Sequence, residues 1–374
     1  MSPAPHIGML LSSLCAEGTP VLALDIAKLW RRAGVKLQVW TLQSSPSDLA
    51  AEFQEAGIEV RSMAITQRGY SKFPALAWRA FEICRRHRLD AVLSFPFGWH
   101  SYIAWGAGLA GTGTVVAHAG NYPPVGDSVG VRKLRVTVAI GDVWRPHIAC
   151  CSDHVREGLA QYLGIPASRL HTIYNGVDLA RFAGTAAPGR PLREPLRIGM
   201  VARFEPHKDQ PTLLRAIREL KSRDVNICVD LIGDGSRRAE YQALAEQLDI
   251  AGCIHFLGVR RDIPDLLRGW DLFVFSVSPD EGLGVALIEA LAAGVPVVAS
   301  DVGACREVLN CPVYGILGEL FPAGDSVELA NAILRFRDHP EPWWDRAARA
   351  TASVHTRFSI EAMSDSYLRL LGVV

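Results

Sequence analysis

Two cations lie in a loop that follows an apolar stretch of the chain. The stretch reads Gly199-Met200-Val201 and continues as Ala202-Arg203-Phe204-Glu205-Pro206-His207-Lys208. A planar guanidinium and an ammonium suit the oxygens of a diphosphate, and the N-terminus of a following helix adds positive partial charge. Lysine is rare, with 6 residues against 33 arginines, which singles out Lys208. Arg203 and Lys208 therefore indicate an anion site, although two solvated loop cations would give the same pattern.

A glycine loop opens a helical stretch further along the chain. It reads Ser278-Pro279-Asp280-Glu281-Gly282-Leu283-Gly284-Val285 and runs on to Glu289 and Ala290. Glycines let a ligand approach the backbone closely, and the N–H groups of a first helical turn bind phosphate or polarise a sugar hydroxyl. Glu281 and Glu289 are eight positions apart, so one carboxylate can reach a hexose and the other a ribose. Alternatively, Glu281 only stabilises the helix dipole, whereas Glu289 lies among apolar residues where a charge needs a partner.

The elements that must position these loops are strands and helices that alternate along the chain. Short apolar runs alternate with helical periodicity from end to end, and the first two runs flank a helical stretch that ends at Gly34. Strands this apolar imply parallel sheets covered on both faces, with ligand sites at the carboxyl ends of the strands. The expected strands are His6–Leu11, Leu37–Thr41, Ala91–Ser94, Thr114–Ala117, His147–Ala149, Leu196–Val201, Ile227–Ile232, Ile254–Leu257, Leu272–Phe275 and Val297–Ala299.

Length and composition indicate two folded domains. The 374 residues exceed one ordinary core, and 49% hydrophobic with 21% charged residues excludes a disordered or fibrous chain. The periodicity lapses between Leu179 and Arg193, where glycine and proline accumulate. The predicted α/β domains are residues 1–183 and 194–354.

Charge and cysteine content exclude further classes of protein. The 39 basic residues cancel the 39 acidic ones, so no broad field attracts nucleic acid and any anion site is local. The 8 cysteines contain no C-x-x-C pair, so neither a disulfide framework, a zinc ribbon nor another metal site is expected. Residues 91–126 carry no Asp, Glu, Lys or Arg, but His100, His118 and several glycines divide them into pieces too short to span a bilayer. The N-terminus lacks a signal-peptide pattern, so a cytoplasmic protein is expected, with peripheral contact at the inner face of the membrane left open.

Taken as a set, these motifs resemble the retaining glycosyltransferases of family 4. The resemblance rests on Arg203 and Lys208 after a strand, on E-x7-E from Glu281 to Glu289, and on Ala293-Gly294-Val295-Pro296-Val297-Val298-Ala299. Ile173-Tyr174-Asn175-Gly176-Val177-Asp178 is similar to the stretch before the family's interdomain linker. The match covers nearly the whole second half and is weaker in the first.

This resemblance implies a GT-B fold. Its two Rossmann-like domains, each with a doubly wound parallel sheet, face a cleft. The N-terminal domain binds mainly the acceptor, and the C-terminal domain binds the nucleotide-sugar donor. A C-terminal helix, about residues 355–374, is expected to cross back onto the first domain.

The family also implies a role for each candidate residue of the second half. Arg203 and Lys208 would hold the diphosphate and stabilise charge on the leaving nucleotide. Glu289 would bind the ribose and Glu281 the donor sugar. The backbone N–H groups of the glycine loop would bind sugar or phosphate, and the loop after the strand at 254–257 would meet the base. The residues of these two loops are Gly282, Leu283, Gly284, Val285, Gly258 and Val259.

Two candidates come from the first half. His118 lies just past the run Thr114–Ala117, where similar enzymes carry a histidine facing the donor sugar, and a structural histidine is the alternative. The first strand–helix loop of the family carries paired glycines, whereas Cys15-Ala16-Glu17-Gly18-Thr19 has only Gly18, which leaves its part in binding open.

The resemblance therefore implies retaining transfer of a hexose-type sugar to an acceptor hydroxyl. The acceptor would be a glycan, a lipid-linked or a small molecule in polysaccharide, glycolipid or natural-product biosynthesis. Neither metal nor cofactor is expected, and the co-substrate would be a UDP-sugar or, next, a GDP-sugar. The alternatives are an epimerase of the same architecture, a non-catalytic nucleotide-sugar-binding protein and, third, a dehydrogenase, because a fold alone does not choose among them. The oligomeric state, the sugar and the acceptor stay open.

Overall fold

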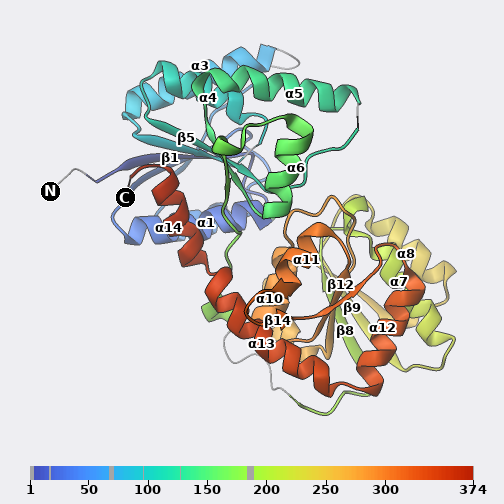
Figure 1. Cartoon of the computed structure of the whole chain (residues 1–374). Coiled ribbons are helices and arrows are strands. Elements are labelled where there is room, and N and C mark those ends of the chain that lie inside the picture. The colour runs from blue at the N-terminus through green and yellow to red at the C-terminus, as the bar shows by residue number, and fades with distance from the viewer. Residues whose placement is uncertain are drawn as a thin grey trace. The chain divides into compact units, whose positions relative to one another are not determined.

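The computed structural model describes residues 4–16, 18–66, 71–95, 97–126, 128–182 and 189–373. The chain divides into two units, Met1–Gly176 with Ile360–Val374, and Val177–Ser359 (Figure 1). Each unit contains a parallel sheet with helices on both faces, which confirms the α/β class predicted from the alternating apolar runs. In the described part of the chain, no helix combines the length and the apolar character needed to cross a bilayer.

The first unit is built on a seven-stranded sheet with the order β3-β2-β1-β4-β5-β6-β7. The two edge strands, β3 and β7, have three residues each and were not predicted, because so short a run shows no periodicity. Pairing with β6 extends β5 to Ala119, so His118 lies within the strand and not just past it. The strands are β1 His6–Leu11, β2 Lys36–Thr41, β3 Val60–Ser62, β4 Ala91–Ser94, β5 Thr114–Ala119, β6 His147–Cys150 and β7 Leu170–Thr172.

Helices cover both faces of this sheet. Helices α1 and α14 lie on one face, and α3, α4 and α5 lie on the other (Figure 1). Buried residues of α1 and α14 join one apolar core with β1, so the last helix belongs to the first unit, as the resemblance implied. The helices are α1 Gly18–Arg32, α2 Ala50–Glu55, α3 Lys72–His87, α4 His100–Leu109, α5 Val129–Gly141, α6 Asp153–Leu163 and α14 Ile360–Leu370.

The second unit is built on a six-stranded sheet with the order β10-β9-β8-β11-β12-β15. The strand order reverses between β8 and β11, which are neighbours, and in open α/β sheets ligands bind at such a reversal. The edge strand β15 was not predicted, and β13 and β14 form a separate short hairpin. The strands are β8 Leu196–Val201, β9 Ile227–Ile232, β10 Ile254–Gly258, β11 Leu272–Phe275, β12 Val297–Ser300, β13 Asn310–Cys311, β14 Gly315–Ile316 and β15 Glu319–Phe321.

Seven α-helices are described in this unit. Helices α7 and α12 pack against each other, and their apolar residues share one core with β8 and β9. Helix α13 contacts α10 on the other side of the unit. The helices are α7 Gln210–Lys221, α8 Arg238–Gln247, α9 Ile263–Gly269, α10 Val285–Ala292, α11 Gly303–Leu309, α12 Ser326–Asp338 and α13 Glu341–Arg357.

The unit boundaries differ from the predicted ones. The division falls at Gly176, not at 183, because residues Leu179–Phe182 form a short 3-10 helix that contacts α10 and buries Phe182. The return to the first unit begins at Ile360, not at about 355, because α13 is continuous to Arg357 within the second unit. Within the predicted linker between Leu179 and Arg193, residues 183–188 lie outside the described residues.

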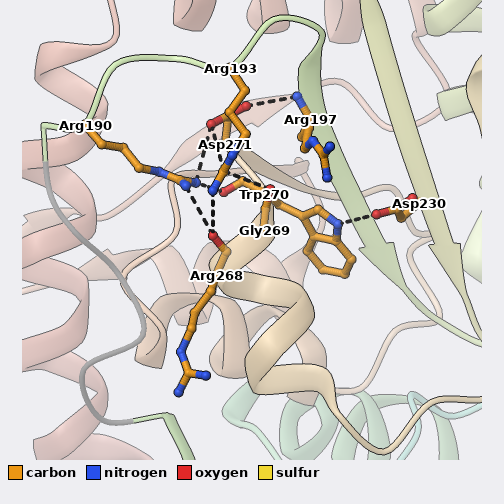
Figure 2. A network of polar contacts seen from close by, with 8 residues as sticks. All are labelled: Arg190, Arg193, Arg197, Asp230, Arg268, Gly269, Trp270 and Asp271. Carbon is orange, nitrogen blue, oxygen red and sulfur yellow. Dashed lines mark hydrogen bonds and ion pairs between the residues drawn. The ribbon is translucent and has the colours of Figure 1, made fainter.

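A buried carboxylate fixes the segment that enters β8. Asp271 is fully buried and lies 3.4 Å from the guanidinium nitrogens of both Arg190 and Arg193 (Figure 2). Its second oxygen accepts a 3.0 Å hydrogen bond from the Arg197 backbone N–H. Both guanidinium groups also donate to carbonyl oxygens at the end of α9, whose negative dipole end they complement. The start of β8 is therefore held to the start of β11, its neighbour at the strand reversal.

Candidate active site

The two loops singled out in the sequence meet at the reversal of the second sheet. The first follows β8 and contains Arg203 and Lys208; the second follows β11 and leads into α10. Because the strands are parallel and adjacent, both loops leave the same edge of the sheet. The backbone N–H of Ser278 donates to the carbonyl of His207 over 2.9 Å, which ties one loop to the other.

Lys208 and Glu281 form an ion pair across these loops. Their side chains are 16% and 9% exposed, so each charge is largely removed from water and needs the other. The Lys208 ammonium also lies 5.6 Å from the centre of the Phe275 ring, within cation–π range. Burial and the neighbouring Lys208 lower the pKa of His207, which keeps that ring neutral at physiological pH. Two predicted site residues, 73 positions apart, are thus in direct contact.

The glycine loop closes against Phe275. Gly284 precedes the first residue of α10 with φ +85°, a left-handed conformation, and no side chain caps the helix. A Cβ atom at this position would lie 2.8 Å from the Phe275 ring. The turn therefore requires glycine at 284 and leaves the first backbone N–H groups of α10 without a side-chain cap. Gly282 and Leu283 are buried, and Val285 is half-buried.

Substituting Gly284 with alanine tests this requirement. We expect G284A to lower the free energy of unfolding by about 1–2 kcal/mol, because an L-residue is strained at this φ and its Cβ meets the ring. Urea unfolding measures the change. The matched control is G252A, since Gly252 is exposed and a Cβ there has nothing within 4 Å. Equal stability of G284A and wild type would contradict the argument.

Arg203 lies on the first of these loops, and Glu289 lies on the helix that follows the second. The Arg203 side chain is exposed, and its carbonyl accepts a 2.8 Å hydrogen bond from the buried Gln210 side chain. Glu289 is half-buried within α10, as its apolar neighbours suggested. The structure therefore places Arg203 on the loop that carries Lys208, and Glu289 on the helix that follows Glu281.

The loops after β9 and β10 complete this edge of the sheet. Gly258 ends β10 with φ +70°, and its carbonyl accepts a 2.8 Å hydrogen bond from the Gly233 N–H, whereas Val259 is 59% exposed. Gly233 has φ +132°, and a Cβ there would lie 2.1 Å from the Ala202 carbonyl oxygen. A Cβ at Gly235 would lie 2.5 Å from the Phe204 carbonyl oxygen. Gly233 and Gly235 were not predicted as site residues, although a Gly-Asp-Gly directly after a predicted strand is a detectable signal.

His118 lies inside the first unit and is 2% exposed. Its Nδ1 is 2.8 Å from the Tyr367 hydroxyl on α14, and its Nε2 has no hydrogen-bond partner within the described residues. Burial lowers the pKa of His118 to about 4, so the ring is neutral near pH 7. Tyr367 could not be predicted as this partner, because it lies 249 positions away in the sequence.

Two buried histidines predict acid sensitivity of the first unit. Burial lowers the pKa of His118 to about 4 and that of His100, on α4, to about 3, against about 6.5 in the unfolded chain. Below pH 6.5 only the unfolded chain takes up these protons, so stability is lost as the pH falls from 6.5 towards 4. In this pH range each histidine lowers the free energy of unfolding by about 1.4 kcal/mol for every unit by which the pH falls. Urea unfolding at pH 7.5, 6.5 and 5.5 should show a smaller loss for H100Q than for wild type, and parallel losses would contradict the assignment.

Gly18 is the first residue of α1 in the first unit. It is exposed, and a Cβ there would meet nothing within 4 Å, so the backbone does not require glycine. Gly18 lies between β1 and α1, where the family carries its glycine loop, but its local geometry adds no support for a binding role.

A solved structure shares the fold of the whole chain. The crystal structure of Alr3699/HepE from Anabaena in complex with UDP and glucose superposes with a TM-score of 0.83 at 22% identity, covering 99% of this chain and 100% of that chain. A likeness at this identity shows the fold, and it confirms the GT-B class.

Curated relatives are glycosyltransferases. The phosphatidyl-myo-inositol mannosyltransferase of Mycolicibacterium smegmatis is 32% identical over 227 residues, which are 60% of this chain and 56% of that protein. The D-inositol 3-phosphate glycosyltransferase of Salinispora tropica is 27% identical across 95% of this chain and 83% of that protein. Several relatives, the mannosyltransferase among them, are matched over only about half of their length.

Two family models match the two halves of the chain. Residues 16–181 match the model described as Glycosyltransferase Family 4, and residues 195–339 match the one described as Glycosyl transferases group 1. Together they account for most of the chain, including both loops at the strand reversal. The chain belongs to family 4 of the glycosyltransferases.

Proposed function

We propose that this protein transfers a hexose-type sugar from a nucleotide-diphosphate sugar to an acceptor hydroxyl, with retention at the anomeric carbon. The observation that carries the proposal is the contact of Lys208 with Glu281 beside the glycine-opened start of α10. A cation, a carboxylate and backbone N–H donors within one small region suit the diphosphate and the hydroxyls of such a donor.

In this proposal the enzyme accelerates transfer mainly by stabilising the negative charge on the leaving nucleotide. Negative charge grows on the diphosphate as the glycosidic bond breaks, and the Lys208 ammonium, the Arg203 guanidinium and the N-terminal dipole of α10 stabilise it. These groups do the work that a divalent cation does in other enzymes, so transfer is proposed to be independent of metal. Glu281 accepts hydrogen bonds from the donor sugar and Glu289 from the ribose.

Retention is proposed to proceed on one face of the sugar. No side chain is assigned as a nucleophile, so the acceptor hydroxyl attacks from the face that the nucleotide leaves. The departing phosphate takes the acceptor proton, and no covalent glycosyl-enzyme forms.

UDP is the proposed nucleotide, with the base at Gly258 and Val259. The fold neighbour HepE has been crystallised with UDP and with UDP-glucose, which supports this choice over GDP. Relatives named for transfer to phosphatidyl-myo-inositol and to D-inositol 3-phosphate support a hydroxyl-rich or lipid-linked acceptor.

A thermal-shift screen against UDP, GDP, TDP and their sugars tests the donor site. We expect UDP and at least one UDP-sugar to raise the melting temperature, since a ligand that binds only the folded state stabilises it. Release of UDP that depends on an acceptor then tests for transfer, and an alpha-linked product from an alpha-linked donor tests for retention. The same assay with and without EDTA tests whether transfer needs a metal. Binding without any transfer would favour a nucleotide-sugar-binding protein, and conversion of the donor without an acceptor would favour an epimerase.

We also propose that the first unit contacts the membrane surface through α5. This helix carries three cations, Arg132, Lys133 and Arg135, and no carboxylate. Its outward positions Val129, Val136 and Ile140 are 68%, 60% and 40% exposed, at a spacing that gathers them along one side of the helix. A helix with exposed apolar and basic residues suits the interface of an anionic bilayer.

Vesicle sedimentation tests this contact. We expect the protein to sediment with vesicles that contain phosphatidylglycerol, and the doubly reversed variant R132E/K133E to remain in the supernatant. R218E/R337E is the matched control, because it reverses two exposed arginines on the other unit. Equal sedimentation of both variants would contradict the proposal.

A further inference from the structure

Three side chains of different chemistry converge on the second sheet, outside the proposed donor site. The Cys228 Sγ, one Asp230 carboxylate oxygen and the His255 Nδ1 all lie within 4.8 Å of one another. The Asp230 oxygen is 2.9 Å from His255 Nδ1, and the Cys228 sulfur is 3.6 Å from the same nitrogen. Among the described residues, no other group of three potential metal ligands meets this criterion.

Strand pairing brings the three residues together. Cys228 and Asp230 are two positions apart on β9, so their side chains leave the same face of the sheet. His255 is the register partner of Asp230 on β10, the adjacent edge strand. Cys228 is the second residue of β9, near the amino end, whereas Lys208 and the glycine loop follow the carboxyl ends of their strands. The cluster is thus a separate feature of the same unit.

The geometry does not fit a cysteine–histidine–aspartate catalytic relay. Such a relay needs the thiol on one ring nitrogen and the carboxylate on the other. Here both groups approach Nδ1, and a nitrogen that donates to Asp230 cannot also accept from the Cys228 thiol. When Nδ1–H donates to Asp230, the Cys228 sulfur is left as a weak second acceptor and its thiol proton cannot use this nitrogen. A cation that accepts a lone pair from all three atoms would use each of them as a ligand.

The sulfur–nitrogen separation matches that of a tetrahedral zinc site. Bonds of about 2.3 Å to sulfur and about 2.0–2.1 Å to nitrogen place these two ligands about 3.6 Å apart, as found for Cys228 and His255. The nitrogen–oxygen separation in such a site is about 3.4 Å, so the carboxylate needs to move by only about 0.5 Å.

Trp270 holds the carboxylate in place. Its ring N–H donates a 2.8 Å hydrogen bond to the other oxygen of Asp230, and the indole is 1% exposed (Figure 2). A ligand whose second atom is fixed by a neighbour is a regular feature of metal sites. Arg197, the register partner of Cys228, is the nearby cation, and its exposed side chain can turn to solvent.

We propose that Cys228, Asp230 and His255 bind one Zn²⁺ ion, with water as the fourth ligand. Thiolate, imidazole and carboxylate together suit zinc better than magnesium or calcium. On binding, the thiol proton of Cys228 leaves to solvent and a sulfur–zinc bond forms. The ion would cross-link the edge strand β10 to β9 and takes no part in the sugar transfer proposed above.

Cobalt substitution of the full-length protein tests the site. The EDTA-treated, reduced protein is titrated with Co²⁺, and we expect one equivalent to produce a thiolate-to-cobalt charge-transfer band in the near ultraviolet that one equivalent of Zn²⁺ abolishes. C228S should lose this band, and H255Q should weaken Co²⁺ binding at least tenfold. The matched control C253S should keep it, since Cys253 is also half-buried and donates to the Ile250 carbonyl, outside the cluster.

The melting temperature gives a second measurement that does not depend on the thiolate band. Zn²⁺ in excess over its dissociation constant should raise the melting temperature of wild type and C253S, and it should leave that of C228S unchanged. No saturable band in wild type, a band that survives in C228S, or a band that C253S abolishes would overturn the proposal. A folded C228S, verified by circular dichroism, ensures that loss of the band reports loss of the ligand.

Discussion

Replacing Lys208 with methionine is expected to lower the rate of sugar transfer at least 100-fold. The ammonium is the least exposed cation at the proposed diphosphate site and lies against Glu281 and Phe275. A loss of about 2.7 kcal/mol of transition-state stabilisation corresponds to this factor. Steady-state kinetics with a UDP-sugar measures the change, and a small effect on KM with a large effect on kcat would locate the loss in the transition state.

A matched pair of variants separates this role from a structural one. K208M also leaves the Glu281 carboxylate, 9% exposed, without its cation, which destabilises the fold by about 1–3 kcal/mol. The double variant K208M/E281Q removes the unpaired charge and should recover most of that stability. If transfer recovered with stability, the diphosphate assignment of Lys208 would be wrong. R203A should lower transfer more than tenfold, because the Arg203 guanidinium is proposed to stabilise the charge on the leaving diphosphate.

Asp271→Asn is expected to lower the free energy of unfolding of the second unit by about 2–3 kcal/mol. The carboxylate is fully buried between two guanidinium groups, and loss of its charge leaves Arg190 and Arg193 facing each other. Breaking a fully buried ion pair lowers the free energy of unfolding by about 3–5 kcal/mol. We expect a smaller loss here because the two arginine side chains are 21% and 37% exposed, so water screens part of the interaction. Asparagine keeps the shape and can still accept from the Arg197 N–H, so the change reports the charge.

D265N is the control for this prediction. Asp265 pairs with Arg268 on the surface of the neighbouring α9, and its side chain is 68% exposed, so its neutralisation should change stability by less than about 0.5 kcal/mol. Chemical denaturation of the full chain measures both variants. Equal free energies of unfolding for D271N and D265N would contradict the prediction, because the buried Asp271 charge would then stabilise the start of β8 no more than a surface charge does.

The central strands could be predicted closely from the sequence. The bounds of β1, β4, β8, β9 and β11 agree with the predicted ones, because most residues of these strands are apolar and buried. The edge strands β3, β7 and β15 were missed. They are short, and their pairing depends on a neighbour that lies far away in sequence.

The sequence by itself determined the family, the two α/β units, the loops that carry Arg203, Lys208 and Glu281, and the helix that carries Glu289, since local periodicity and motif spacing encode them. Only the tertiary structure decided which of these side chains touch. The contacts of Lys208 with Glu281, of His118 with Tyr367 and of Cys228 with His255 join residues 73, 249 and 27 positions apart. Such contacts depend on the order and register of the strands and on the packing of the last helix against the first unit. A sequence pattern does not contain this information, because the pairing of strands is set by packing over the whole unit.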